Sequence, residues 1–310
     1  MNKRPVWIDC DPGVDDAAAI VLADHLEGME IVGISTVAGN AVLELTTENA
    51  LKICELIGKD YPVYPGAAHP LLHPYEAGES FHGADGLGGA KLPQTHRTAE
   101  KLPAWDALYE AAKRSEEKLE LIVLGPQTNI AIALSKHPDL PQYLNRILMM
   151  GGSATRGNCT PSAEFNIHAD PEAAQIVFRS PVPKVMAGLE VTEQAFLTAD
   201  EIAWIGAQQG RACRFFREAT PDLLRKNMEA GQGGWCVHDA CAVLYCVRPE
   251  LFSGKEAGVF VETQSELTLG KTVTDLFSDK KFEEKNTFVL LDIDRPAFRD
   301  TLTDAICAVR

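Results

Sequence analysis

The sequence runs Asp9-Cys10-Asp11-Pro12-Gly13-Val14-Asp15-Asp16 close to its start, so four carboxylates fall within eight residues. Apolar residues precede this acidic segment at positions 6–8 and follow it at positions 17–23. This order is typical of a strand, a tight turn and a helix. The acidic segment therefore lies at the carboxyl end of a predicted buried strand, which is the end where parallel sheets bind their ligands.

The crowding of carboxylates in the acidic segment requires an explanation. Four like charges at the mouth of a buried strand repel one another unless a positive charge lies among them. Ca²⁺ and Mg²⁺ bind clusters of oxygen ligands, so a hard divalent cation is the first candidate. Helix capping is the alternative, and it accounts for Asp15 or Asp16. Because capping does not account for Asp9 and Asp11 as well, we interpret the segment as a metal or catalytic site.

Two known motifs share parts of the acidic segment. An EF-hand calcium loop needs Gly at its sixth position and Glu at its twelfth. Counted from Asp9, these positions hold Val14 and Ile20, so the sequence excludes an EF-hand. Phosphatases of the haloacid dehalogenase type also carry Asp-x-Asp after their first strand, but their motif continues with Gly-Thr. Here Asp11 is followed by Pro12, and a Mg²⁺-dependent phosphatase of this type remains the enzymatic alternative.

Length and composition limit the class of protein. The 310 residues are 45% hydrophobic and 24% charged, and no Pro/Ser/Gly-rich linker divides them, so we predict one domain over residues 1–310. The net charge of −15 argues against a nucleic-acid partner, whose phosphates require a basic surface. No window approaches the roughly 18 apolar residues of a membrane span. A predicted strand begins almost at the N-terminus, so we expect no signal peptide and a cytoplasmic protein.

The eight cysteines form no CxxC pair, and several lie in apolar stretches. Scattered buried thiols in a reducing compartment are the interpretation that fits this pattern. Cys10 lies inside the acidic segment and is a conceivable nucleophile. Its carboxylate neighbours raise the pKa of the thiol and suppress the thiolate, so we favour a structural role for Cys10.

Short β-type runs alternate with helical patterns along the chain. The predicted strands span residues 5–9, 31–36, 119–124, 146–150, 182–187, 259–263 and 288–293. The predicted helices span residues 15–25, 43–58, 104–115, 128–137, 170–179, 199–208, 210–227, 238–247 and 295–308. This alternation predicts an α/β fold with an open, mostly parallel, doubly wound (Rossmann-like) sheet and helices on both faces.

Polar, Gly-rich segments follow several of the predicted strands. Besides the acidic segment, they comprise residues 38–40, 125–129, 151–153 and 164–166. Each segment alone reads as an ordinary loop. The carboxyl ends of parallel strands meet at one edge of a sheet, so together these segments predict a polar cup that holds the site.

The acidic segment and a series of further motifs resemble those of the nucleoside hydrolases, the inosine–uridine-preferring type of nucleoside N-ribohydrolase. The resemblance runs the length of the chain and includes Thr36-Val37-Ala38-Gly39-Asn40, His82-Gly83-x-x-Gly86-Leu87-Gly88, Gly125-Pro126-Gln127-Thr128-Asn129-Ile130-Ala131, Met150-Gly151-Gly152, Gly157-Asn158, Ala163-Glu164-Phe165-Asn166, Asp170-Pro171-Glu172-Ala173-Ala174 and His238-Asp239. So many motifs in one order make the match specific. It implies hydrolysis of the N-glycosidic bond of ribonucleosides to ribose and free nucleobase, in nucleoside salvage.

The resemblance also implies a metal and a mechanism. One Ca²⁺ per chain would be bound by Asp11, Asp16, Asp239 and the backbone carbonyl of Thr128, which are the hard oxygen ligands that Ca²⁺ prefers. The bond breaks through a transition state with oxocarbenium character. Asp11 would act as the general base on a Ca²⁺-bound water. His238 resembles the group that protonates or hydrogen-bonds the leaving base.

The substrate-binding residues are implied in the same way. Four of them, Asp15, Asn40, Glu164 and Asn166, would clamp the ribose hydroxyls. Met150 and Phe165 would form apolar walls beside the substrate, with Trp235 as a further wall. Residues 81–89 and 231–235 would act as mobile lids, for which surface loops are the plain alternative. The implied substrate-binding set is Asp15, Asn40, His82, Met150, Asn158, Glu164, Phe165 and Asn166.

Some points stay open at the level of sequence. The family commonly shows Gly-Leu-Asp-Val-Thr-His where this chain has Glu190 and Glu193 at the third and sixth positions, which leaves the contacts of this segment open. Base contacts would come from residues 75–90 and 220–235, so purine or pyrimidine preference is open too. Family members are usually dimers or tetramers, which implies a homodimer or homotetramer. A non-catalytic Ca²⁺-dependent ribose-binding protein is the second alternative, although it would need no base at Asp11.

Overall fold

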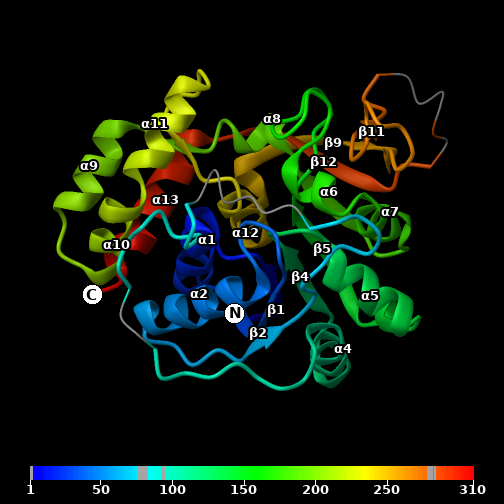
Figure 1. Ribbon diagram of the computed structural model, residues 1–310, viewed down its shortest axis with the longest axis horizontal. Helices are drawn as coiled ribbons and strands as arrows, with labels where there is room; N and C mark the ends of the chain where they lie inside the picture. The colour runs from blue at the N-terminus through cyan, green and yellow to red at the C-terminus, as the bar shows by residue number, and fades with distance from the viewer. Residues whose placement is uncertain (1–2, 76–82, 93–94, 278–281, 283) are drawn as a thin grey trace.

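The computed structural model describes residues 3–75, 83–92, 95–277, 282 and 284–310, which form an α/β fold around an eight-stranded sheet (Figure 1). The strands lie in the order β3-β2-β1-β4-β5-β6-β12-β9, and only the β12–β9 pair is antiparallel. The mostly parallel sheet that the sequence predicts is therefore confirmed. The strand bounds are β1 Arg4–Cys10, β2 Met29–Thr36, β3 Val63–Pro65, β4 Leu119–Val123, β5 Leu144–Met150, β6 Lys184–Ala187, β9 Phe252–Ala257 and β12 Thr287–Ile293.

Strand order reverses at the centre of this sheet. After β1 the chain adds β2 and β3 on one side, then crosses to the other side and adds β4, β5 and β6. β1 and β4 are paired in parallel, with Asp9 opposite Val123, so their carboxyl ends lie side by side. Ligands of open α/β sheets bind at such a reversal point. The fold thus places the acidic segment where a ligand site is expected.

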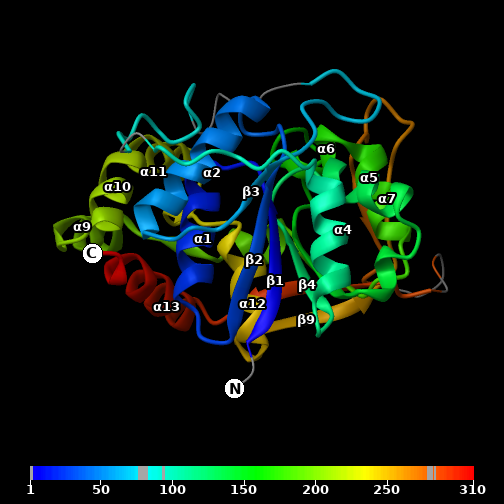
Figure 2. The same ribbon diagram turned by 90° about the horizontal axis from the view of Figure 1, so that it is seen from below.

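Helices cover both faces of the sheet, as predicted (Figures 1 and 2). Alternate side chains of β1 enter the two cores, because Val6 and Ile8 belong to one hydrophobic cluster and Trp7 to the other. The first face is covered by α1 Val14–His25, α2 Leu43–Ile57, α12 Ala240–Val247 and α13 Arg295–Ala308. The second face is covered by α4 Ala104–Arg114, α5 Thr128–Lys136 and α7 Pro171–Arg179.

Two of the predicted elements differ from what the structure shows. The strand expected at residues 259–263 is β10 (Val259–Val261), which pairs with β11 (Thr272–Thr274) in a separate antiparallel ribbon. The helix expected at residues 210–227 is two helices, α10 Arg211–Ala219 and α11 Pro221–Glu229. Proline has no N–H to donate to the preceding turn, so it starts a new helix.

Short elements around the site complete the fold. A second ribbon pairs β7 (Phe196–Leu197) with β8 (Trp235–Cys236). The other helices of the described residues are α6 Phe165–Ala169, α8 Leu189–Thr192 and α9 Ala199–Ala207, with 3₁₀ turns at Leu140–Gln142 and Pro249–Leu251. In the part of the chain that the structure describes, no helix combines the length and the hydropathy that a membrane span needs.

The cysteines agree with the expectation of thiols that form no disulfide, with two exceptions to their burial. No disulfide joins any two of the eight cysteines in the part of the chain that the structure describes, but Cys159 is exposed and Cys307 is only half-buried. Burial raises the pKa of the Cys10 thiol well above its usual range, and the nearby Asp16, Asp9 and Asp11 raise it further. This supports a structural role for Cys10, because a protonated thiol is a poor nucleophile.

Candidate active site

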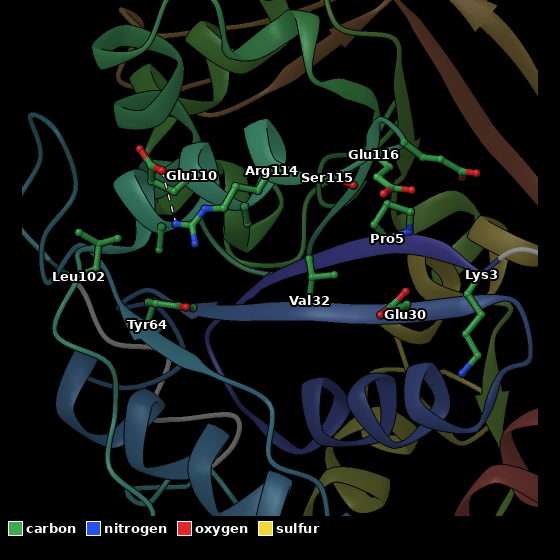
Figure 3. Close-up of a pocket in the computed structure, with 13 residues that line it drawn as sticks. Lys3, Pro5, Glu30, Val32, Tyr64, Leu102, Glu110, Arg114, Ser115 and Glu116 are labelled. Carbon is green, nitrogen blue, oxygen red and sulfur yellow. Dashed lines mark hydrogen bonds and ion pairs between the residues drawn. The ribbon is translucent and has the colours of Figure 1, made fainter.

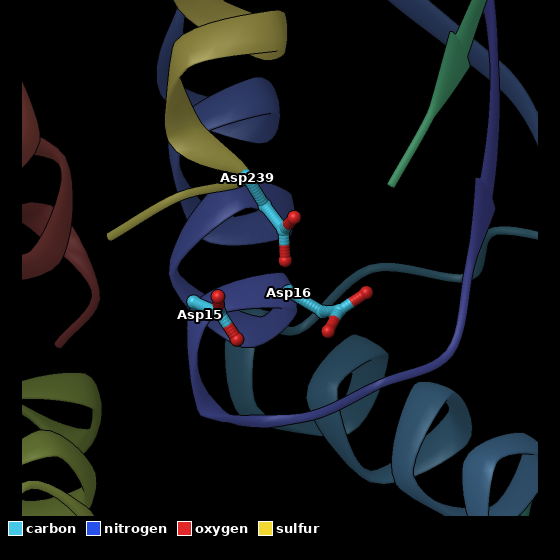
Figure 4. Close-up of side chains that lie close together, drawn as sticks. All are labelled: Asp15, Asp16 and Asp239. Atoms are coloured by element: carbon cyan, nitrogen blue, oxygen red, sulfur yellow. The ribbon is translucent and has the colours of Figure 1, made fainter. Parts of the chain in front are cut away.

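Three carboxylates converge where two helices begin. Asp15 and Asp16 lie in the first turn of α1, and Asp239 lies directly before α12. α1 packs against α12, so the two helix starts lie together. One carboxylate oxygen from each aspartate lies within 4.8 Å of the others, and all three residues are buried. Figure 4 shows Asp239 reaching from the start of α12 toward Asp15 and Asp16.

The electrostatics of this carboxylate cluster favour a bound cation. Burial raises the pKa of Asp15 to about 6. Burial also raises the pKa of Asp239 well above its usual range, and the charges of Asp15, Asp16 and Asp11 add to the shift. A divalent cation among these oxygens would offset both the desolvation and the repulsion. The donor set is all carboxylate oxygen, which matches hard cations such as Ca²⁺ and Mg²⁺, so the cluster could bind a metal.

Asp11 lies beside this cluster in a tight niche. Its Oδ2 accepts a 2.7 Å hydrogen bond from the backbone N–H of Asn40. A Cβ atom added at Gly39 or Gly125 would come within 2.1 and 2.5 Å of the carboxylate oxygens of Asp11. These two glycines therefore leave the space that the Asp11 carboxylate occupies. Burial, and next the charge of Asp16, raise the pKa of Asp11 well above its usual range.

The carboxylates that lie closest together in the structure are not the same set as the expected metal ligands. Asp16 and Asp239 come together, as the family resemblance implied, but the third member of the closest carboxylate cluster is Asp15. Asp15 was expected to bind ribose. Asn40 connects the two groups, because its Nδ2 donates to the Asp11 carbonyl (3.2 Å) and to Asp16 Oδ2 (3.3 Å). Asp11, Asp15, Asp16, Asn40 and Asp239 therefore form one polar group.

Thr128 begins α5, after the carboxyl end of β4. Its hydroxyl donates to Asp170 Oδ2 at 2.7 Å, and Asp170 also caps α7. The next residue, Asn129, donates from Nδ2 to Asp9 Oδ1 (2.8 Å) and to the Thr36 carbonyl (3.0 Å). Asn129 therefore ties the start of α5 to the carboxyl ends of β1 and β2. Sequence reasoning gave Asn129 no such role, because its partners are distant in the chain.

A second group of expected substrate residues gathers at the carboxyl ends of β4 and β5. Asn166 Nδ2 donates to the carbonyls of Leu124 (2.6 Å) and Met150 (3.2 Å). Asn158 Oδ1 accepts a 3.0 Å hydrogen bond from the N–H of Phe165. Met150 and Asn166 are buried, Phe165 is half-buried and Asn158 is exposed. The structure therefore brings these residues together around the start of α6.

Glu164 is the N-cap of α6 and is buried. Its carboxylate accepts hydrogen bonds from the N–H groups of Gly152 (2.8 Å), Asn166 (2.9 Å) and Ile167 (3.2 Å). Burial raises the pKa of Glu164 to about 7, against the lowering effect of these backbone donors. A carboxylate has about four lone-pair sites, so Glu164 keeps capacity for one further donor such as a hydroxyl.

The raised pKa of Glu164 makes stability depend on pH. A carboxyl whose pKa rises from 4.5 to about 7 on folding binds its proton more tightly in the folded chain. The contribution of the Glu164 carboxyl to the free energy of unfolding is therefore lost as the pH rises from 4.5 to about 7, by up to about 1.4 kcal/mol per pH unit. We expect Glu164→Gln, which cannot ionise, to gain stability relative to the parent protein between pH 5 and pH 7.

Urea unfolding of Glu164→Gln and the parent protein at pH 5, 6 and 7 measures this difference. Glu229→Gln removes an exposed carboxylate from α11 and serves as the surface control. A difference between Glu164→Gln and the parent that stays constant over the three pH values would contradict the assignment.

His238 lies in the turn before α12 and is half-buried. Its Nδ1 lies 2.8 Å from the hydroxyl oxygen of Thr192, the last residue of α8. His82 lies outside the described residues. Trp235, expected in a mobile lid beside the substrate, is instead buried in β8 and contacts Phe216 with a 5.7 Å ring separation. The burial of Trp235 does not fit a mobile surface lid, and its role as an apolar wall stays a prediction.

The two departures from the family pattern have partners in the structure. Glu190 Oε1 accepts from the hydroxyls of Ser153 (2.8 Å) and Thr155 (2.7 Å). Glu193 forms an ion pair with Arg156 at 2.7 Å. Both contacts join α8 to the loop that follows β5. The sequence gave no signal for Arg156, because its acidic partner lies 37 residues away.

A separate groove of about 670 Å³ lies at the opposite end of the sheet (Figure 3). It runs between α4 and the amino ends of β1 and β2, and its lining includes Pro5, Val32, Glu110 and Arg114. Glu110 and Arg114 lie within ion-pair distance of each other, at 3.4 Å. Because the acidic segment follows the carboxyl end of β1, this groove is distinct from the polar site described above.

Comparison with known proteins gives full-length matches. A family model described as inosine-uridine preferring nucleoside hydrolase matches residues 6–300. RihC, a non-specific ribonucleoside hydrolase of Escherichia coli, is 41% identical over 304 residues, covering 98% of each chain. The structure of a purine-preferring ribonucleoside hydrolase from Gardnerella vaginalis has a TM-score of 0.92 at 32% identity, covering 98% of each chain. A plant nucleoside hydrolase has a TM-score of 0.92 at 27% identity, covering 98% of this chain and 99% of that one.

Proposed function

Because the chain belongs to the inosine–uridine-preferring nucleoside hydrolase family, we propose that it hydrolyses the N-glycosidic bond of ribonucleosides to ribose and free base, in nucleoside salvage. The observation that carries this proposal is the convergence of buried Asp15, Asp16 and Asp239 where β1 and β4 end side by side. Relatives are named non-specific and purine-preferring, so both purine and pyrimidine ribonucleosides are candidate substrates.

Ca²⁺ is the cation that we propose for the carboxylate cluster. Asp11, Asp16, Asp239 and the carbonyl of Thr128 would hold it, and Asp15 adds a carboxylate of the same cluster. Ca²⁺ accepts six to eight oxygen ligands in flexible geometry, which suits a group of several carboxylates. When bound, it supplies positive charge that acidifies water and orients hydroxyl groups.

Asp11 is the general base in this proposal. It accepts the proton of the water that attacks the anomeric carbon, and its niche fixes the carboxylate in one place. The N–H of Asn40 donates to Oδ2, and Gly39 and Gly125 leave the space that the Asp11 carboxylate occupies. The transition state carries positive charge at the anomeric carbon and ring oxygen, so the surrounding carboxylates stabilise it.

The remaining site residues divide between the two halves of the substrate. Asp15, Asn40, Glu164 and Asn166 hold the ribose hydroxyls, with Asn158 at the edge of the same group. Met150 and Phe165 form apolar walls. His238 donates a proton or a hydrogen bond to the departing base. We also propose that His82, which is not among the described residues, contacts the substrate.

Removing Ca²⁺ should lower the melting temperature, because the three clustered carboxylates then repel one another without compensation. A ligand at about 100 times its Kd stabilises a folded protein by about 2.7 kcal/mol. We expect metal analysis to find one Ca²⁺ per chain and calorimetry to show a melting temperature that rises with Ca²⁺ concentration. Stoichiometric Zn²⁺, or full activity with no metal, would contradict the assignment.

Matched variants separate stabilisation by Ca²⁺ at the carboxylate cluster from a general effect of ions on the melting temperature. Asp239→Asn removes one carboxylate of the cluster and should greatly weaken the response of the melting temperature to Ca²⁺. Asp304→Asn removes an exposed carboxylate of α13 and should leave that response unchanged. Light scattering of the same samples tests the proposed homodimer or homotetramer.

The experiment that tests the function itself is a substrate screen. Purine and pyrimidine ribonucleosides should each be incubated with the Ca²⁺-loaded protein and assayed for reducing sugar. A nucleoside hydrolase releases ribose and base in equal amounts. Binding of ribose or nucleoside in calorimetry without sugar release would instead favour a Ca²⁺-dependent ribose-binding protein.

A further inference from the structure

Thr192 makes a partly buried contact with His238 that joins two elements far apart in the sequence. The hydroxyl oxygen of Thr192 lies 2.8 Å from His238 Nδ1, and the two residues are separated by 46 positions. Thr192 has no solvent exposure. Its backbone N–H is used separately, in a 3.1 Å hydrogen bond to the carbonyl of Gly188.

The direction of this hydrogen bond decides where His238 carries its proton. Within the described part of the chain, His238 Nδ1 is the one partner of the Thr192 hydroxyl. A buried hydroxyl that fails to donate loses a hydrogen bond that it would make in water, which costs free energy. The favourable arrangement therefore has Thr192 donating to the lone pair of Nδ1. A neutral imidazole that accepts at Nδ1 carries its proton on Nε2.

We propose that Thr192 is a positioning residue that holds His238 in the tautomer with its proton on Nε2. The inference rests on the proposed function, because it gives the Nε2–H group the task of donating to the departing base. Thr192 itself contacts neither sugar nor base. It acts through His238, as the residue that fixes the ring orientation and the tautomer.

α8, the helix that ends at Thr192, is held by contacts with the loop after β5. At the start of the helix, the N–H of Leu189 donates to the Gly152 carbonyl at 3.0 Å. Glu190 accepts hydrogen bonds from Ser153 and Thr155 in the loop after β5. Gly152 also donates to Glu164 at 2.8 Å. α8 therefore ties His238 to the loop that carries the proposed ribose-binding residues.

Two variants of Thr192 test the proposal. Thr192→Val keeps the shape but removes the donor, and should slow hydrolysis of inosine by about tenfold, as expected for loss of one hydrogen bond. Hydrolysis of a nitrophenyl riboside should stay within about twofold, because nitrophenolate departs without a donor. Thr192→Ser keeps the hydroxyl and should restore the rate on inosine.

A spectroscopic measurement tests the tautomer without any activity. Long-range ¹H–¹⁵N correlation of the imidazole nitrogens should give a protonated Nε2 and an unprotonated Nδ1 for His238, assigned by its loss in His238→Ala. Thr192→Val should shift this pattern toward a mixture of the two tautomers, whereas Thr192→Ser should not. The measurement requires only the folded, Ca²⁺-loaded protein.

Several results would overturn the proposal. A protonated Nδ1 in the parent protein, or an equal loss of rate on inosine and the nitrophenyl riboside in Thr192→Val, would do so. An unchanged rate on inosine in Thr192→Val would also overturn it. If the parent protein released no ribose from any nucleoside, the proposed function would fail, and the nitrogen spectra would still decide whether Thr192 fixes the tautomer.

Discussion

Asp11→Asn should lower the rate of hydrolysis of every ribonucleoside by about 10² to 10⁴, the usual contribution of a general base. Asn has nearly the same shape, so the 2.7 Å hydrogen bond from the N–H of Asn40 can persist to the amide oxygen. The amide accepts no proton from water at neutral pH. The loss should therefore appear in kcat and be similar for good and poor leaving groups.

Two controls are needed for Asp11→Asn. Metal analysis must show that the variant still binds Ca²⁺, because Asp11 is also a proposed ligand. Asp24→Asn removes a carboxylate from the far end of α1, where Asp24 contacts Tyr61 and Lys59, and should retain the parent rate. Near-parental turnover by metal-loaded Asp11→Asn would show that another group takes the proton.

His238→Ala should divide substrates by their leaving groups. Natural nucleosides should slow by about 10² or more, because the departing base loses its donor. A nitrophenyl riboside should react at nearly the parent rate, since nitrophenolate is a stable anion. The ratio of kcat/KM for the two substrates measures the effect as a difference in transition-state stabilisation.

The alternative roles of His238 give different results. Equal slowing of both substrates would mean that His238 acts on the adjacent Asp239 and the metal instead of on the base. Unchanged rates on both would make His238 a structural residue whose contact with Thr192 holds the turn before α12. His137→Ala is a suitable control, because that histidine pairs with Asp106 on the opposite face of the sheet.

The buried centre of the fold could be predicted from the sequence, and the periphery could not. β1, β4 and β5 are apolar runs bounded by turns, which is a strong local signal. β9 was missed because four of its six residues are exposed, as suits a strand at the edge of the sheet. The break between α10 and α11 was missed although Pro221 marks it, because the helical pattern continues on both sides. The prediction of one domain over residues 1–310 stays a prediction.

In the candidate site, too, some features could be predicted from the sequence and others could not. Residues of the acidic segment could be located because they follow β1 in an open α/β sheet. Contacts between distant segments, such as Thr192 with His238 and Arg156 with Glu193, leave no pattern in a single sequence. The grouping of Asp15 with Asp16 and Asp239 depends on the packing of α1 against α12, which spacing alone does not encode.

The central claim is that the carboxylate cluster binds Ca²⁺ and that the loaded site cleaves ribonucleosides. The most direct test measures ribose and free base released from inosine and uridine by the same preparation, first stripped of metal and then reloaded with Ca²⁺. We expect equal amounts of ribose and base from the reloaded protein and a large loss of both after stripping. Reloaded protein that holds one Ca²⁺ per chain yet releases no ribose from any ribonucleoside would contradict the account.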